Sequence, residues 1–176
     1  EDVYTQAAEV TAELLNAEQV AIYIVGKNAY YLRQKVRRGE KISELARSLK
    51  IEEFPYLQEL MAKQSIFVNK KLEEGLPDLA APVVFQNKVI AVIQIFDLDF
   101  EKWNLSQQNL LAVTARLIAS ALGKAYQYEE GIQSRKYIEN TRIIRQEEFI
   151  KICREVRRRQ QVLNTSAQAA YLRITA

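Results

Sequence analysis

The side chains that most often carry catalytic chemistry are sparse in this sequence of 176 residues. It contains no histidine, which excludes histidine triads, histidine-ligated zinc or haem, and a histidine phosphoacceptor. It contains one cysteine, Cys153, so no disulfide can form within the chain. No paired carboxylates, glycine-rich phosphate loop or pair of nucleophile and base stands out. We therefore predict no catalytic residue, no metal site and no cofactor.

Basic residues recur at a spacing that could hold a phosphate. Arg33 and Arg37 are four residues apart, and so are Arg154 and Arg158, which is similar to a nucleotide-gripping arrangement. With 25 Lys and Arg in the chain, such pairs also arise by chance. Aromatic residues are scarce around Arg154, so we interpret this cluster as a solvated helix face and predict no nucleic-acid partner.

The candidate ligand contacts lie in and around residues 80–96, where two runs of β-branched and aromatic residues flank Asn87 and Lys88. This pattern predicts a tight antiparallel hairpin that pairs Val84 with Ala91. Strand alternation then predicts two faces: the first carries Phe85, Ile90, Val92 and Gln94, and the second carries Val84, Ala91, Ile93 and Ile95. Ala91 is small enough to let a helix approach the second face closely. We therefore expect the first face to meet a helical insert and any cavity.

A candidate ligand pocket follows from this assignment of faces. Its expected members are Tyr23, Phe67, Phe85, Val92 and Gln94. Gln94 is the only polar side chain within the second strand of the hairpin. The competing interpretation is that Gln94 is a buried amide paired within the core.

The rest of the chain supplies the elements that position this hairpin. Apolar residues at helical spacing predict a helix over residues 2–16 and a long one from Leu105 to Glu130 with Ser106 as its N-cap. Between them we expect strands at 18–25, 29–36 and 66–69, and a helical insert at 43–49 and 52–62. Both faces of the hairpin are apolar, so helices must cover both sides of the sheet.

The terminal helices carry more apolar surface than one sheet face can cover. We therefore expect a homodimer that buries the surplus in a bundle of helices from two chains. The residues expected in this contact are Val10, Leu14, Leu117 and Leu122.

Charge divides the chain near Gly131. Residues 1–130 hold 15 Lys and Arg against 18 Asp and Glu, whereas residues 131–176 hold 10 against 4. We therefore predict one domain over 1–130 and a basic linker with the start of another over 131–176. No apolar run reaches the length of a membrane span, so we expect a cytoplasmic location, with a membrane anchor upstream left open.

The predicted order of helix, hairpin, helical insert, strand, hairpin and long helix resembles a GAF domain over residues 2–130. The segments that carry the resemblance are Ala81-Pro82-Val83-Val84, the hairpin from Asn87 to Ile93, and the helix start from Leu105 to Leu111. The resemblance implies an α+β fold with an antiparallel sheet, helices on both faces and long terminal helices. It also implies a sensory or dimerisation role, with a small molecule as a candidate ligand.

Residues 141–149 are similar to the opening segment of GGDEF (diguanylate cyclase) domains, in which a threonine precedes a phenylalanine as Thr141 precedes Phe149. Residues 153–175 resemble that family's first helix and strand. Where cyclases carry metal-binding carboxylates, this chain has Arg173 and Thr175, and an arginine there would repel Mg²⁺. The resemblance is therefore to a degenerate GGDEF domain.

A GAF domain followed by a degenerate GGDEF domain resembles the membrane-bound cyclic di-GMP receptors that control export of Pel-type exopolysaccharide. The resemblance implies a non-catalytic regulatory module of a bacterial signal-transduction protein that responds to cyclic di-GMP. Two alternatives stay open: a ligand-free scaffold for protein interaction and dimerisation, and a fragment of a nucleotide-processing enzyme.

Overall fold

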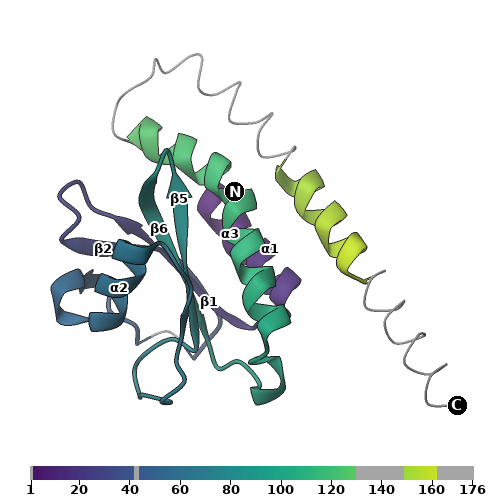
Figure 1. Ribbon diagram of the computed structural model, residues 1–176. Coiled ribbons are helices and arrows are strands. Elements are labelled where there is room, and N and C mark those ends of the chain that lie inside the picture. Colours follow the sequence, from purple (N-terminus) through teal and green to yellow (C-terminus); the bar gives the residue numbers. More distant parts are fainter. Residues whose placement is uncertain (1, 42–43, 130–148, 162–176) are drawn as a thin grey trace, which may run out of the picture.

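The computed structural model describes residues 2–41, 44–129 and 149–161 and is built around one antiparallel sheet (Figure 1). Six strands pair in the order β3-β2-β1-β6-β5-β4. The strands are β1 (Gln19–Val25), β2 (Tyr31–Arg38), β3 (Ser48–Lys50), β4 (Phe67–Val68), β5 (Leu79–Phe85) and β6 (Lys88–Phe96). The helices are α1 (Val3–Leu15), η1 (Ile51–Glu53), α2 (Pro55–Lys63), η2 (Phe100–Lys102) and α3 (Leu105–Glu129).

Helices cover both faces of this sheet, as the sequence predicts. The terminal helices α1 and α3 lie side by side on one face, and α2 lies on the other (Figure 1). Each face has its own apolar cluster: Ile22, Ile93 and Ile95 pack with α1 and α3, whereas Tyr23 and Val92 pack with η1 and α2. The fold is the expected α+β arrangement.

Side-chain caps set where the two terminal helices begin. Asp2 precedes α1, and its carboxylate accepts a hydrogen bond of 2.8 Å from the backbone N–H of Thr5. Asn104 precedes α3 in the same way and accepts a hydrogen bond of 2.8 Å from the N–H of Gln107. The expectation that Ser106 caps α3 is therefore wrong, because Ser106 already lies inside the first turn.

The central hairpin forms, but its register differs from the expected one. Gln86 and Asn87 adopt φ values of 52° and 62° and make the two-residue turn, so Phe85 pairs with Lys88. A bulge follows, so that Val84 pairs with Val89 and Val83 with Ala91. The predicted pairing of Val84 with Ala91 is wrong.

The shifted register corrects part of the face assignment. Val92 and Gln94 face the insert, and Ala91, Ile93 and Ile95 face the terminal helices, as expected. Phe85 and Ile90 pack on the side of the terminal helices and Val84 packs on the insert side, each opposite to the prediction. The cause is the bulge, because one extra residue in a strand reverses the alternation on one side of it.

The insert contains less helix than predicted. Instead of a helix over 43–49, residues 48–50 form the edge strand β3, in which Lys50 pairs with Tyr31 of β2; residues 42–43 lie outside the described residues. The second predicted helix is present as η1 and α2. Pro55 is the first residue of α2, a position where its missing N–H is tolerated.

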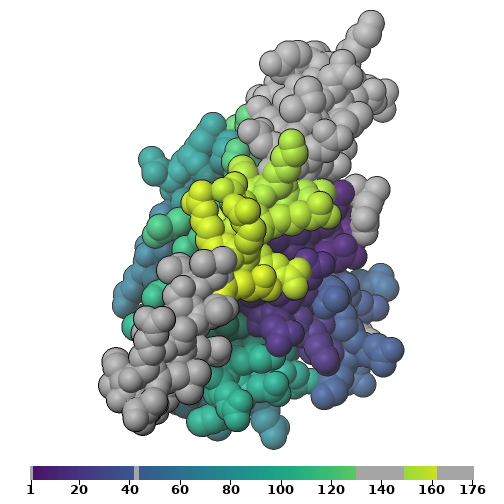
Figure 2. Space-filling model, turned by 90° about the vertical axis from the view of Figure 1, so that its right-hand side faces the viewer, coloured from purple at the N-terminus to yellow at the C-terminus, as the bar shows by residue number. Residues whose placement is uncertain are grey.

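Residues 149–161 form a further helical segment that lies across the surface of α1 (Figure 2). The predicted domain boundary near residue 131 and the strand predicted near residue 174 both lie outside the described residues. Among the residues that the structure describes, no helix is both long and apolar enough to cross a membrane.

Candidate functional site

Four of the five residues expected to line a ligand pocket lie on one side of the sheet. Tyr23, Val92 and Gln94 are buried beneath the insert, and Gln94 is 1% exposed. Phe67 packs against the ring of Tyr56 from α2, with 4.6 Å between ring centroids. The fifth residue, Phe85, lies on the opposite face, so the structure does not bring it to the other four.

The polar groups of these residues are paired with protein atoms. The side-chain amide of Gln94 donates a hydrogen bond of 2.9 Å to the hydroxyl of Tyr56. The Tyr23 hydroxyl donates to the carbonyl of Ala46 at 2.8 Å and accepts a hydrogen bond of 3.2 Å from Gln34. Gln94 therefore has the geometry of a buried structural amide, the alternative interpretation of its position in the strand.

Burial also keeps the two tyrosines of this face uncharged. Desolvation raises the pKa of Tyr56 well above its ordinary value of 10.0, because a buried phenolate would lose its hydration. Desolvation raises the pKa of Tyr23 as well, against opposing effects of the Gln34 hydrogen bond and the positive charge of Arg37. Neither hydroxyl has the lowered pKa that would suit a general base or a nucleophile.

Apolar side chains of the insert occupy the space above this face. The buried ones are Ile51, Tyr56, Leu57 and Leu60. The face predicted to line a cavity thus forms a second hydrophobic core between the sheet and the insert. The sequence could not identify Tyr56 as the partner of Gln94, since the two residues are 38 positions apart and belong to different elements.

An open depression lies at the turn between β1 and β2, near the end of α3. It has a volume of about 630 Å³, and its lining includes Lys27, Tyr30, Tyr31, Arg33 and Tyr126. The rings of Tyr30 and Tyr31 are exposed. Its walls come from the adjoining ends of β1 and β2, the turn between them, Ser48 of β3 and the end of α3.

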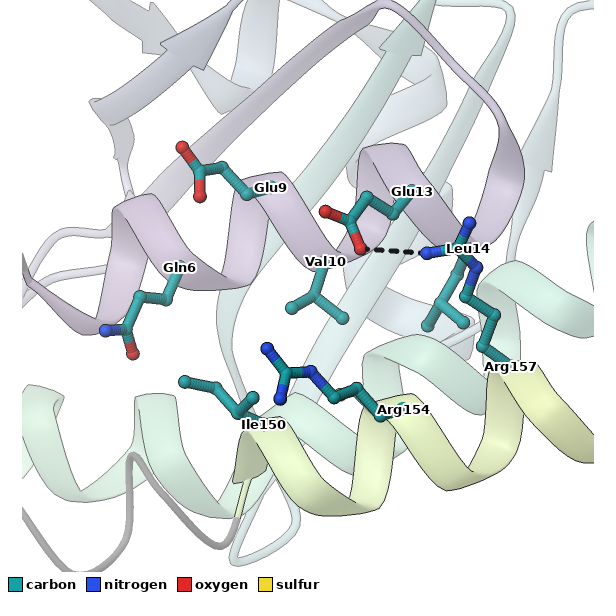
Figure 3. Close-up of a pocket in the computed structure, with 9 residues that line it drawn as sticks. Gln6, Glu9, Val10, Glu13, Leu14, Ile150, Arg154 and Arg157 are labelled. Atoms are coloured by element: carbon teal, nitrogen blue, oxygen red, sulfur yellow. Dashed lines mark hydrogen bonds and ion pairs between the residues drawn. The ribbon is translucent and has the colours of Figure 1, made fainter.

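A narrower groove separates α1 from the helical segment 149–161 (Figure 3). Its volume is about 160 Å³, and its lining residues are Gln6, Glu9, Val10, Glu13, Leu14, Ile150, Cys153, Arg154 and Arg157. A guanidinium nitrogen of Arg157 lies 3.2 Å from a carboxylate oxygen of Glu13. Burial raises the pKa of the Cys153 thiol to about 12, so this thiol is protonated at neutral pH.

The residues expected in a dimer contact separate into two groups. Val10 and Leu14 are partly buried and line the groove beside residues 149–161. Leu122 is 1% exposed inside the core of the single chain, so it offers no surface to a partner. Leu117 lies on α3 and is partly buried. The predicted dimer surface is therefore reduced to α1 and the exposed part of α3.

The acidic and sulfur-containing side chains of the described ranges do not gather into a metal site. In residues 2–41, 44–129 and 149–161, no group of three or more Cys, Asp or Glu is placed to hold a metal ion. The ion pairs join surface residues, such as Lys35 with Glu129 at 2.9 Å.

The model of the GAF domain family matches residues 1–122. A search of curated proteins returned no match.

Solved structures with the same fold include the second GAF domain of DevS from Mycobacterium smegmatis, with a TM-score of 0.57, 15% identity, and coverage of 73% of this chain and 96% of that one. PelD 158-CT from Pseudomonas aeruginosa PAO1 aligns with a TM-score of 0.54 and 13% identity over 66% of this chain and 39% of that one. PelD 156-455 from Pseudomonas aeruginosa PA14 in complex with c-di-GMP gives a TM-score of 0.53 and 14% identity over 65% and 39%. The aligned part is thus about two fifths of the PelD structures.

Proposed function

Because the chain belongs to the GAF domain family, whose members are generally regulatory modules, we propose that it is a non-catalytic regulatory module of a bacterial signal-transduction protein. It acts through the contacts of its helices with other protein surfaces. The observation that carries this proposal is the packed insert face of the sheet. Tyr23, Val92 and Gln94 are almost completely buried there, and both polar side chains have protein partners.

A ligand on that face would have to displace α2. It would break the hydrogen bond between Gln94 and Tyr56 and expose the apolar residues around it, which costs free energy that ligand contacts would need to recover. Signal transmission by protein contacts requires no such rearrangement. A ligand-free dimerisation scaffold is the second candidate, and the same packed face favours it.

We propose more specifically that the signal to which the whole protein responds is cyclic di-GMP. This proposal is supported by the likeness in fold to PelD, one structure of which is a complex with c-di-GMP, and by the similarity of residues 141–175 to a degenerate GGDEF domain. In this proposal residues 1–130 are the GAF module, and residues 131–176 are the basic linker and the first helix and strand of the second domain. The nucleotide contacts lie outside residues 1–130, and the regulated process is exopolysaccharide export.

Calorimetric titration with cyclic di-GMP tests this proposal. We expect the natural full-length protein to bind and the 176-residue chain to show no saturable binding. Saturable binding to the 176-residue chain that a Gln94→Leu substitution abolishes would contradict the packed-face argument. Absence of binding to the full-length protein would contradict the cyclic di-GMP proposal.

Incubation with GTP and Mg²⁺ tests the non-catalytic part. Phosphoryl transfer depends on positioned metal ions, and the positions that align with cyclase metal ligands are Arg173 and Thr175. We expect no turnover. Product formation that follows the protein peak through repurification would contradict the proposal.

A further inference from the structure

The helical segment 149–161 is amphipathic, and its apolar side is already used. Phe149 and Cys153 are 4% and 2% exposed and belong to the same apolar cluster as α1 and α3. The rest of the segment is strongly basic, with five Lys and Arg against one Glu. This segment therefore presents both an apolar contact and a positive charge to the neighbouring surface.

The surface of α1 has the complementary character. Residues 3–15 contain two glutamates, Glu9 and Glu13, and no Lys or Arg. Glu13 lies in the last turn of α1, where the helix dipole disfavours a negative charge and where α1 has no basic residue of its own. The guanidinium of Arg157 supplies a positive charge there at 3.2 Å. In Figure 3, Val10 and Leu14 point from α1 toward the segment, on the same side as this ion pair.

The polar side of the contact between the two helices is open to solvent. The side chains of Arg157 and Glu13 are 48% and 59% exposed, so water and salt weaken their attraction. A groove of about 160 Å³ remains between the helices, enough to hold several water molecules. Val10 and Leu14 are only partly buried beneath the segment. These features indicate that the polar side of the contact contributes little to holding the helix in place.

We propose that the α1 surface around Val10, Leu14 and Glu13 is a docking surface for the basic helix 149–161 of the same chain, and that docking is reversible and covers the surface that a second copy would use. The chain itself supplies the argument for this occupant: residues 130–148 tether the helix to α3, which keeps its local concentration at α1 high. Docked, the helix leaves α1 closed to a second copy. When the helix is released, Val10 and Leu14 become available to a second copy for the homodimer. This proposal rests on the proposed regulatory function, in which helix contacts with other protein surfaces carry the signal.

Cys153 reports directly on docking. A buried, protonated thiol reacts slowly with an alkylating agent, and release of the helix exposes it. We expect Cys153 of the native protein to react with iodoacetamide much more slowly than in the same protein unfolded by guanidinium chloride. Raising the salt concentration should increase the native rate, because screening weakens the attraction between Arg157 and Glu13.

Charge variants identify the contact. Arg157→Glu places two negative charges together, so we expect the alkylation rate of Cys153 to rise by about two- to fivefold. The double variant Glu13→Arg with Arg157→Glu reverses the pair, and we expect its rate to return to near that of the unmodified protein. Arg158→Glu is the matched control, since it makes the same change in net charge at an exposed position of the same helix. Far-UV circular dichroism confirms that each variant is folded.

Sedimentation of the same variants tests the second half of the proposal. We expect the dimer fraction to increase in Arg157→Glu. In the double variant we expect it to return to near that of the unmodified protein. Equal alkylation rates for Arg157→Glu and Arg158→Glu would overturn docking at α1. Faster alkylation with no increase in dimer would overturn the role of the helix in covering a dimer surface. Failure of the proposed regulatory function can be distinguished from failure of helix docking. GTP turnover by the unmodified protein would contradict the regulatory function without altering the alkylation rates of Cys153.

Discussion

At the scale of single residues, the pairing of Gln94 with Tyr56 explains why a polar side chain lies within the apolar strand β6. A lone amide within an apolar strand predicts either a ligand contact or a buried structural pair, and the sequence left both open. The hydrogen bond of 2.9 Å to Tyr56 favours the structural pair. The sequence does not reveal this partner, because the Tyr56 hydroxyl of α2 reaches Gln94 only after the insert has packed on the sheet.

Removing the Tyr56 hydroxyl should leave the Gln94 amide buried without its partner. We expect Tyr56→Phe to lower the free energy of unfolding by about 1–3 kcal/mol. Combining it with Gln94→Leu removes both polar groups, so the double variant should lose less than the sum of the two single variants. Urea unfolding measures all three. Tyr31→Phe, at an exposed position, is the control and should change stability little. Strict additivity would contradict the pairing.

The buried tyrosines also predict how stability depends on pH. Desolvation raises the pKa of Tyr56 above 10.0, so above that pH the unfolded chain releases a proton that the folded chain retains. This contribution to stability is fully present below pH 10 and is lost as the pH rises past 10. Tyr56→Phe should therefore flatten the fall in the urea midpoint between pH 9 and pH 11, about one unit on either side of an ordinary tyrosine pKa. An unchanged slope would contradict the assigned burial.

At the scale of elements, periodicity predicted the helices better than the sheet register. The apolar stripes predicted α1 and α3, because each of these helices buries one continuous face. The register of the hairpin depended on two local features that the pattern does not encode: the turn at Gln86 and Asn87, and the bulge that follows it. The edge strand β3 was predicted as helix, because its strand character comes from pairing with β2.

The corrected position of Phe85 predicts an effect on helix α3. Gly123 of α3 lies directly against the Phe85 ring, and a β-carbon at position 123 would overlap ring atoms. Replacing glycine by alanine inside a helix normally stabilises it by about 0.5–1 kcal/mol. Here we expect Gly123→Ala to destabilise the protein by about 1–3 kcal/mol, because overpacking outweighs the gain in helix propensity. Thermal or urea unfolding measures the sign.

Two further variants complete this test. Phe85→Leu in the Gly123→Ala background should recover part of the lost stability, since the smaller side chain leaves room for the new methyl group. Ser120→Ala, at an exposed position of the same helix, should be close to neutral or slightly stabilising. A stabilising Gly123→Ala would show that α3 does not approach Phe85 this closely.

At the scale of the whole molecule, the GAF fold is organised as one sheet between two apolar layers. The resemblance stated from the sequence is confirmed by the family match over residues 1–122. The layer toward the insert is closed, whereas the outer surface of α1 carries the basic segment 149–161. The acidic composition of residues 3–15 and the basic composition of residues 149–161 were both visible in the sequence. Their proximity was not, because the two segments lie at opposite ends of the chain.

Native mass spectrometry of the purified protein tests the packed insert face most directly. We expect the mass of the bare chain, 20.3 kDa, together with twice that mass for the homodimer, and no retained small molecule. A noncovalent small-molecule adduct that persists through desalting and disappears in the Gln94→Leu variant would contradict this expectation, because that adduct would have to occupy the face where Gln94 and Tyr56 pair.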